Sequence, residues 1–394
     1  MLKHTLKILF ILQRALLILS YCFFRYCIGK RKKNISWVVV GQEIAATVQY
    51  ISNSIPGSYS VCFYDNQYYD FHYNFFMRKT KSKYLDKVKK NVIGPLLLGL
   101  LLNRTNSFFY IGQGGFLFSG LDGREFEFMY LKNKNKNIVC FFTGTDIRSP
   151  KLMLDFAEKN KIEVISTYHY LLHPEQLTLE YETSKKKLAS VAETYADIVF
   201  NSSVDQMSYF TKKTQPGIYF LPDEKFKTKN DAKFSNVETY KICHAPTSPI
   251  IKGTQLVRAA ITKLRVEGFR FEYCELIGVS NEVVLKELRA AHIVLNEFYA
   301  LVPGVFGVEA MASHCALVTS ADEHIETDLP PDSNKAWYVT KNYEIYDHLK
   351  ELLNSPDLIR KYADAGYEWA IENASFSRSS VKLASLLKRI EKKT

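Results

Sequence analysis

The sequence predicts an α/β protein of two Rossmann-like domains whose parallel sheets face each other across a cleft. Three observations support this fold class. The chain has 394 residues, more than the roughly 250–300 residues that one hydrophobic core usually serves. From residue 35 onward, short runs rich in β-branched and aromatic residues alternate with helical patterns. A poorly periodic stretch, residues 219–240, separates two such series and is interpreted as the crossing between domains.

Residues 1–34 are predicted to form a membrane-associating amphipathic helix followed by a basic run. On a helix with 100° per residue, one narrow stripe holds the basic residues Lys3, Lys7, Arg14 and Arg25. Such a helix can lie in a membrane interface, and the KRKK run at 30–33 adds attraction to anionic lipid. The same run favours the cytoplasmic face of the membrane for the globular part. A single spanning helix over 6–28 and a helix packed on the protein's own body remain open alternatives.

Residues 35–225 are predicted to form the N-terminal, acceptor-side domain. Its first strand, 35–41, reads as a buried strand that ends in Gly41, and a helix over 42–55 follows. The later strands are predicted at 58–64, 107–112, 137–144, 162–167 and near 200.

Residues 226–370 are predicted to form the C-terminal domain. Its first strand is at 240–246, and the helix after it covers about 253–267. The further strands are expected at 271–278, 291–298 and 315–322. Two helices split near 373–375 end the chain, and the last of them, within 371–394, is expected to pack back on the N-terminal domain.

The net charge limits the classes of partner that the protein can bind, and the cysteines indicate the redox state of its compartment. A net charge of +11 suits nucleic acid, an anionic membrane surface or a phosphorylated substrate. Nucleic acid is disfavoured, because the chain has no arginine-rich arm, zinc-finger spacing or helix-turn-helix pattern. Seven scattered cysteines without a C-x-x-C pair indicate a reducing compartment.

The stretch PGVFGVEAMA, residues 303–312, is the first candidate binding element. It follows a predicted strand, so it lies at the carboxyl edge of the sheet, where ligands of such folds bind. Gly304 and Gly307 allow close approach of the backbone, and a helix start offers free N–H groups to phosphate oxygens. Glu309 lies among apolar residues and can accept hydrogen bonds from a ribose diol. The alternative is a carboxylate that caps the helix start.

The stretch HAPTSPIIKGTQLVRAAI, residues 244–261, is the second candidate. It places Thr247, Ser248 and Lys252 in a loop between a strand and a helix, at the same edge of the sheet. A lysine and a helix N-terminus can together neutralise a diphosphate without metal, and the chain has no D-x-D triplet to hold a divalent ion. No metal site is therefore expected.

These residues resemble a known family. KGT at 252–254, PGVFGVEAMA and the strand CALVTSAD look like the donor half of GT-B glycosyltransferases, in particular the retaining family 4. NIVCFFTGTDIRS, residues 137–149, is similar to an acceptor-half element of bacterial polysaccharide, O-antigen and capsule transferases. The resemblance covers about residues 35–370.

The resemblance implies roles for individual residues. Glu309 matches the second glutamate of an E-x7-E motif and would bind the nucleotide ribose, while Lys252 would bind the diphosphate. Leu301 stands where the first glutamate is expected and Thr143 where a histidine is expected; Glu297 is the candidate replacement for the missing carboxylate. The implied catalytic residues are Lys252, Glu309 and Glu297. The implied donor-binding residues are Thr247, Ser248, Lys252, Gly253, Gly278, Gly304, Val305, Phe306 and Glu309. The implied acceptor-side residues are Gly41, Asp146 and Arg148, the last two having a local ion pair as the alternative.

The expected function is transfer of a sugar from a nucleotide diphosphate sugar to a lipid-linked saccharide in bacterial cell-envelope polysaccharide biosynthesis. The reaction is expected to retain configuration and to need no metal or cofactor. The expected partners are the nucleotide sugar, the lipid-linked acceptor and an anionic membrane surface. Alternatives are a catalytically silent GT-B scaffold in a saccharide-assembly complex and a nucleotide-sugar epimerase. A dinucleotide-dependent dehydrogenase is disfavoured, because VVVGQEIAAT has one glycine where G-x-G-x-x-G needs three.

Overall fold

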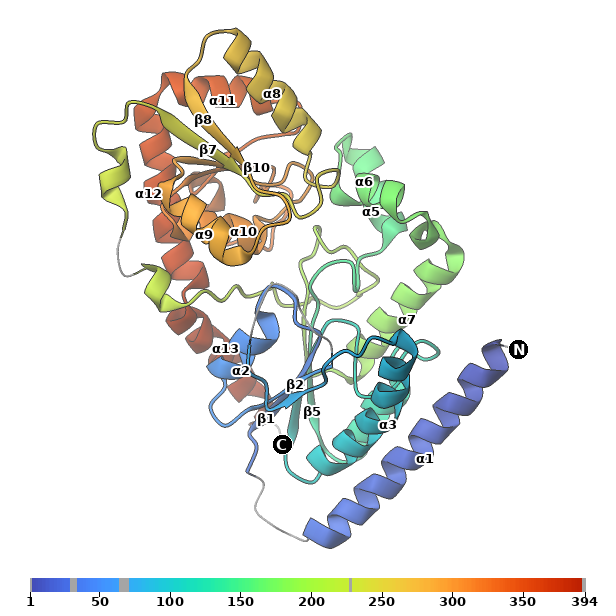
Figure 1. The fold of residues 1–394 in the computed structure, drawn as a ribbon. Helices are drawn as coiled ribbons and strands as arrows, with labels where there is room; N and C mark the ends of the chain where they lie inside the picture. The colour runs from blue at the N-terminus through green and yellow to red at the C-terminus, as the bar shows by residue number, and fades with distance from the viewer. Residues whose placement is uncertain (1, 29–33, 64–70, 227–228, 392–394) are drawn as a thin grey trace.

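The computed structural model describes residues 2–28, 34–63, 71–226 and 229–391 and shows two α/β domains, each built on a parallel sheet (Figure 1). The basic run at 30–33 lies outside the described residues. The N-terminal sheet has six strands in the order β3-β2-β1-β4-β5-β6. Their bounds are β1 (Trp37–Gly41), β2 (Tyr59–Cys62), β3 (Phe75–Phe76), β4 (Ser107–Ile111), β5 (Asn137–Phe141) and β6 (Ile198–Phe200).

The C-terminal sheet has five strands in the order β11-β10-β9-β7-β8, and every pair of neighbours is parallel. The strands are β7 (Tyr240–His244), β8 (Phe271–Glu275), β9 (Ile293–Leu295), β10 (Ala316–Thr319) and β11 (Tyr338–Val339). β7 pairs with β9 so that His244 lies opposite Leu295. This register brings the loops after both strands to one edge of the sheet, where the candidate donor residues lie.

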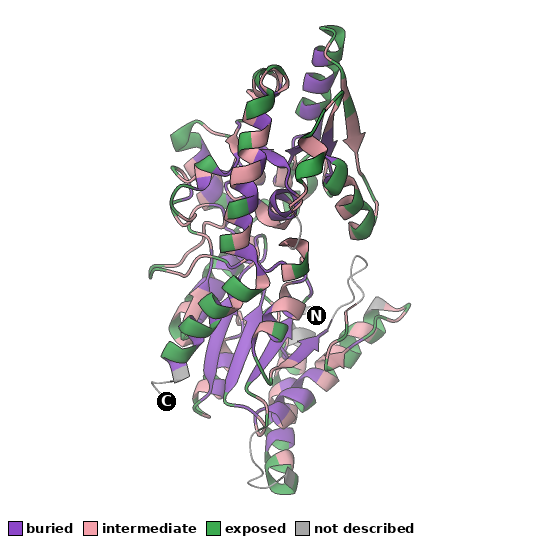
Figure 2. Cartoon of the chain, turned by 90° about the vertical axis from the view of Figure 1, so that its left-hand side faces the viewer, coloured by how far each residue is buried: buried purple, intermediate pink, exposed green. Residues whose placement is uncertain are grey.

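Successive side chains along each strand point to opposite faces of the N-terminal sheet. Val38 and Val40 of β1 join the core on one side, whereas Trp37 and Val39 join the core on the other. The first side is covered by α3 (Lys83–Leu101), α4 (Glu125–Lys132) and α7 (Leu179–Tyr195), and the second by α2 (Thr47–Ser54) and α13 (Phe376–Glu391). Both faces are therefore buried, as a parallel sheet requires (Figure 2).

The C-terminal sheet is enclosed in the same way. α8 (Thr254–Val266) and α11 (Ile345–Asn354) pack on one face together with the N-terminal half of α12 (Pro356–Ala374). The helices α9 (Asn281–Ala290) and α10 (Gly304–Ala312) pack on the other face together with the C-terminal half of α12. The chain then returns: Leu383, Leu386 and Leu387 of α13 lie in the core of the N-terminal domain with Trp37. The two crossings of the chain lie side by side, since Leu221 N donates to Ala374 O and Phe376 N to Leu221 O.

Two predicted elements are wrong. Residues 162–167 do not form a strand, because α6 (Ile165–Leu172) starts within them. Tertiary contacts determine this: Ile165 N donates to Tyr299 O in the other domain, and the Tyr168 and Tyr299 rings stack with centroids 4.1 Å apart. α2 begins at Thr47 rather than at 42, because the Glu43 carboxylate turns back to accept the N–H groups of Val48 and Gln49.

α1 (Leu2–Ile28) lies along α3 (Figure 1). The helix α3 was not predicted from the sequence. Pro95 inside α3 has no N–H, so the carbonyl of Asn91 loses its helical donor. Gln13 of α1 supplies the missing donor, with Nε2 3.1 Å from Asn91 O, while its Oε1 accepts from Phe118 N at 2.9 Å. At Gly99 a Cβ would lie 2.1 Å from the Ser20 Oγ, so only glycine permits this contact.

The predicted basic stripe of α1 is partly turned inward. The Arg14 guanidinium lies 3.4 Å from the Asp122 carboxylate and over the rings of Phe10 and Phe126. Residues 13–21 of α1 therefore pack on the N-terminal domain, as the third alternative for this helix predicted. The window Lys7–Cys27 still has mean hydropathy 1.7 and is long and apolar enough to cross a membrane. The other face of the helix is exposed (Figure 2).

Candidate functional site at the domain interface

The structure brings Lys252, Glu297 and Gly304 together beyond the carboxyl ends of β7 and β9. The Lys252 Nζ lies 3.1 Å from the Glu297 Oε1, and the two side chains are 13% and 14% exposed. Gly304 begins α10 with φ +62°, and a Cβ there would lie 3.1 Å from the same Glu297 oxygen. The Phe306 ring centroid is 5.9 Å from the Lys252 Nζ. A cation, a carboxylate and a helix start therefore share one small region.

Glu309 is buried on α10 and is held by two groups that the sequence analysis missed. Its Oε1 lies 3.0 Å from the Lys225 Nζ, and both carboxylate oxygens lie 3.5 Å from the Asn281 Nδ2. Lys225 comes from the crossing between domains and Asn281 from the start of α9. A buried carboxylate is stable only with polar or charged partners, and these two side chains provide them. Neither residue stands out in the sequence, because each is distant from Glu309 along the chain.

The start of α10 also meets the crossing segment. The backbone of Gly304 lies beside the hydroxyl of Tyr219, and burial raises the pKa of Tyr219. Helix N-terminal N–H groups attract anions. The Tyr219 hydroxyl thus lies next to the helix start, whose N–H groups are of the kind that bind phosphate oxygens.

A buried histidine fixes the loop that carries Lys252. His244, the last residue of β7, has Nδ1 2.8 Å from Leu295 O and Nε2 2.9 Å from the Thr254 Oγ1. Burial lowers the pKa of His244 to about 4, so the ring is neutral, with Nδ1–H donating to the carbonyl and Nε2 accepting from the hydroxyl. The ring thereby ties β7, β9 and α8 together directly beside Lys252 and Gly253.

The remaining predicted donor residues lie around this region with different exposure. Ser248 is half-buried and its carbonyl accepts from Lys252 N at 3.1 Å, whereas Thr247 is exposed. Gly253 has φ +74°, and its Cβ would lie 3.3 Å from the Tyr299 ring. Val305 is half-buried next to Gly304. Gly278 is exposed, in the loop between β8 and α9 that leads to Asn281.

Of the residues predicted for the acceptor side, Gly41 and Asp146 make contacts that stabilise the fold. A Cβ at Gly41 would lie 2.7 Å from Ile111 O on the neighbouring strand, so glycine allows β1 and β4 to approach. The Asp146 carboxylate closes its own loop by accepting from Thr143 N at 3.0 Å and Gly144 N at 2.8 Å, and burial raises its pKa. Asp146 therefore shapes the loop after β5.

Arg148 pairs with Asp205 and not with Asp146, so the local ion pair considered as an alternative is wrong. The Arg148 Nη2 lies 3.0 Å from the Asp205 Oδ2, and the Nε donates to Asp205 O at 2.6 Å. The Asp205 Oδ1 accepts from Leu301 N in the C-terminal domain at 2.8 Å. Leu301, at the position where the resemblance expects a glutamate, is buried and bound through its backbone. Arg148 and Asp205 thus connect the two domains.

A second set of contacts joins the domains beside this ion pair. The Glu326 carboxylate accepts from Val204 N at 2.9 Å and Asp205 N at 2.6 Å, and burial raises its pKa. Asp328 accepts from Ser203 N at 2.9 Å. One loop of the N-terminal domain, 203–205, is therefore held by two carboxylates and one turn of the C-terminal domain.

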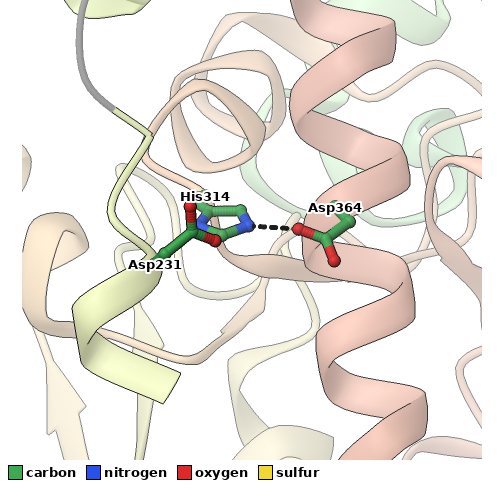
Figure 3. Close-up of side chains that lie close together, drawn as sticks. All are labelled: Asp231, His314 and Asp364. Carbon is green, nitrogen blue, oxygen red and sulfur yellow. Dashed lines mark hydrogen bonds and ion pairs between the residues drawn. The ribbon is translucent and has the colours of Figure 1, made fainter. Parts of the chain in front are cut away.

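One group of potential metal ligands occurs among the described residues, at Asp231, His314 and Asp364 (Figure 3). It lies before β10, at the edge of the sheet opposite to Lys252. Its carboxylates already have cations: Lys229 Nζ lies 2.7 Å from Asp364, and Arg360 contacts both aspartates. The His314 ring joins Asn230 O to Asp364. These contacts make the cluster an ion network that fixes the crossing segment to α12.

The chain matches no protein-family model and no curated protein sequence. Its structure is similar to that of sucrose-phosphate synthase from Thermosynechococcus elongatus, with TM-score 0.60 and 11% identity over 91% of this chain and 100% of that chain. The HepE protein of Anabaena, solved in complex with UDP-glucose, gives TM-score 0.55 and 10% identity over 90% and 99% of the two chains. These structural neighbours are GT-B glycosyltransferases, and with its two parallel-sheet domains the chain has the GT-B fold.

Proposed function

We propose that this protein is a glycosyltransferase that moves a sugar from a nucleotide diphosphate sugar to a lipid-linked saccharide, with retention of configuration and without metal. The observation that carries the proposal is the pair of ionic contacts, Lys252–Glu297 and Lys225–Glu309, on either side of the first turns of α10. In this proposal the two contacts mark two adjacent subsites at this edge of the C-terminal sheet, one for phosphate and one for ribose.

In this proposal Lys252 and the N–H groups at the start of α10 bind the diphosphate. The bond between the anomeric carbon and the diphosphate oxygen breaks, the acceptor hydroxyl oxygen forms the new bond to that carbon, and the departing diphosphate oxygen takes up the hydroxyl proton. Negative charge grows on the departing diphosphate, where Lys252 and the helix start stabilise it. Glu309 binds the ribose hydroxyls, and Glu297 faces the transferred sugar.

The lipid-linked acceptor is supported by the N-terminal helix. α1 has an apolar window, Lys7–Cys27, that is long enough to cross a membrane, and it packs on the domain that carries the acceptor side. A transferase on the cytoplasmic face of a membrane would meet lipid-linked saccharides of the cell envelope there.

A catalytically silent GT-B scaffold is the second candidate function. Leu301 favours it, since a buried, backbone-bound leucine takes the position of the carboxylate that the resemblance expects to contact the sugar. A scaffold has no need to bind a nucleotide sugar, so the two functions differ in a measurable property.

Nucleotide binding tests the proposal. We expect one nucleoside diphosphate and its sugar derivative to raise the melting temperature, because a ligand that binds only the folded state adds about 2.7 kcal/mol of stability at 100 times its Kd. The measurement is a thermal shift across uridine, guanosine, adenosine and thymidine diphosphates and their sugars, with the nucleosides as controls. Absence of a shift with every donor would favour the scaffold.

Chelation tests the metal-independent mechanism. Once a donor is found, transfer is expected to keep its full rate in excess EDTA, because Lys252 and backbone N–H groups take the place of a divalent ion at the diphosphate. The rate of sugar transfer is measured with and without EDTA, at matched ionic strength. Loss of activity that manganese or magnesium restores would disprove this mechanism.

A further inference from the structure

The outward side of α1 is a continuous apolar surface that nothing in the described chain covers. Its exposed side chains are Ile8, Ile11, Leu12, Ile18, Leu19 and Phe23, and Leu19 is 68% exposed. Lone exposed hydrophobic residues are common on proteins, whereas contiguous apolar surfaces mark interaction sites. Only 22% of the residues in the window Lys7–Cys27 are buried.

The neighbouring helix α3 extends this surface. Leu85, Val88, Val92 and Leu96 are exposed at spacings of three and four residues, which places them on one side of that helix. Because α1 lies along α3, the apolar sides of the two helices adjoin. We call these residues of α1 and α3 together the two-helix surface.

The charges around the two-helix surface are almost all positive. α1 contains four lysines and arginines and no acidic residue, and α3 contains four lysines and a single aspartate. Lys7 and Arg25 on α1 and Lys87 and Lys89 on α3 are exposed. Long basic side chains can reach lipid headgroups while the neighbouring apolar residues enter the acyl region.

We propose that the two-helix surface docks on a bilayer containing anionic lipid, with α1 remaining packed on α3 and lying in the plane of the membrane. This docking extends the proposed function. It rests on that function in one respect only, namely that the acceptor is linked to a lipid. It assigns part of the membrane contact to α3, and it excludes insertion of α1 as a spanning helix.

The buried side of α1 explains why the helix stays docked. If α1 left the N-terminal domain, Asn91 O would lose the hydrogen bond from Gln13 and Pro95 O the one from Ser20. The Asp122 carboxylate would lose its ion pair with Arg14. Insertion would also place Arg14 inside the bilayer, which costs roughly 2.5–3.5 kcal/mol at the centre of a spanning helix. In the docked arrangement these polar groups keep their partners and face the protein.

Vesicle binding by variants of the full chain tests the docking surface. The double substitution Val88→Asp and Val92→Asp changes two exposed side chains of α3 and is expected to lower the partition coefficient on phosphatidylcholine vesicles containing phosphatidylglycerol by about tenfold or more. The control is Val266→Asp with Val381→Asp, which changes the net charge equally at two exposed valines elsewhere and is expected to bind as the wild type. Vesicles without phosphatidylglycerol should bind the wild type more weakly.

Equal vesicle binding by wild type and the α3 variant would overturn the proposal. So would a wild type that ignores vesicles and forms a dimer that the α3 variant separates, because the occupant would then be a second copy. A tag placed ahead of residue 1 tests the orientation of α1: in inverted membrane vesicles added protease is expected to remove it, and protection would mean that α1 spans. Nucleotide thermal shifts on the same variants are independent of lipid, so failure of docking and failure of the transferase proposal are distinguishable.

Discussion

Lys252→Ala is expected to lower kcat for sugar transfer by about 10²–10³-fold, the usual cost of removing one preorganised group that stabilises developing negative charge. It should weaken binding of the nucleoside diphosphate and leave binding of the free nucleoside unchanged, since the nucleoside has no phosphates. Transfer rates and calorimetric titration with both ligands measure the two effects.

The same substitution leaves the Glu297 carboxylate, 14% exposed, without its cation. We expect the variant to lose about 1–2 kcal/mol of stability, less than the cost of breaking a fully buried pair, because both side chains keep some contact with solvent. A fall in activity alone therefore does not separate a binding role from a structural role of Lys252.

The double variant Lys252→Ala with Glu297→Gln separates the two roles. Removing the negative charge together with its partner should restore the melting temperature. If Lys252 binds the diphosphate, the double variant melts like the wild type but still binds the diphosphate weakly. If Lys252 serves only to neutralise Glu297, the double variant recovers diphosphate affinity as well, and the phosphate subsite is wrong.

The longer strands of both sheets were predictable because parallel strands are buried on both faces, whereas the two-residue edge strands β3 and β11 were not predicted. The run at 37–41 has no polar side chain, and in the structure all five of its residues, which form β1, are buried. The loop after a strand in a parallel sheet lies at the carboxyl edge, so Lys252 and Gly304 were placed near one another before any contact was known. The structure adds that Glu297 lies between them.

The partners of the predicted residues could not be read from the sequence. Lys225 reaches Glu309 across 84 positions of the chain, and Asp205 reaches Leu301 across 96. The chain has 52 lysines and arginines, and the residues next to Lys225 in the sequence do not indicate that it pairs with Glu309. The helix at 165–172 was mistaken for a strand because its β-branched start is also typical of strands, and the contact with Tyr299 is distant along the chain.

The docking of α1 was hidden for a related reason. The hydrophobic periodicity of 1–34 is equally compatible with a lipid interface, a spanning helix and a packed helix. What distinguishes them is that Pro95 leaves the Asn91 carbonyl without a helical donor, which Gln13 then provides. Asn91 is 78 residues away from Gln13 along the chain, so the sequence of the helix does not reveal this contact.

Glu309→Gln is expected to weaken binding of both nucleoside and nucleoside diphosphate by about 10- to 100-fold, because charge-assisted hydrogen bonds to the ribose diol, worth roughly 1.5–3 kcal/mol, become neutral ones. The contrast with Lys252→Ala is the diagnostic feature, since that change should spare the nucleoside. Calorimetric titration with the two ligands gives both affinities.

The ion pair with Lys225 supplies the control for the same experiment. Lys225→Ala leaves Glu309, whose side chain is 9% exposed, without its cation, so that variant should melt lower than the wild type. The double variant Lys225→Ala with Glu309→Gln removes both charges and should regain most of that stability. If Glu309 binds ribose, the double variant is stable and still binds nucleoside poorly. If Glu309 only satisfies Lys225 and Asn281 within the fold, the double variant binds nucleoside as the wild type does; the ribose subsite would then be disproved, and the scaffold would become the better account of this GT-B protein.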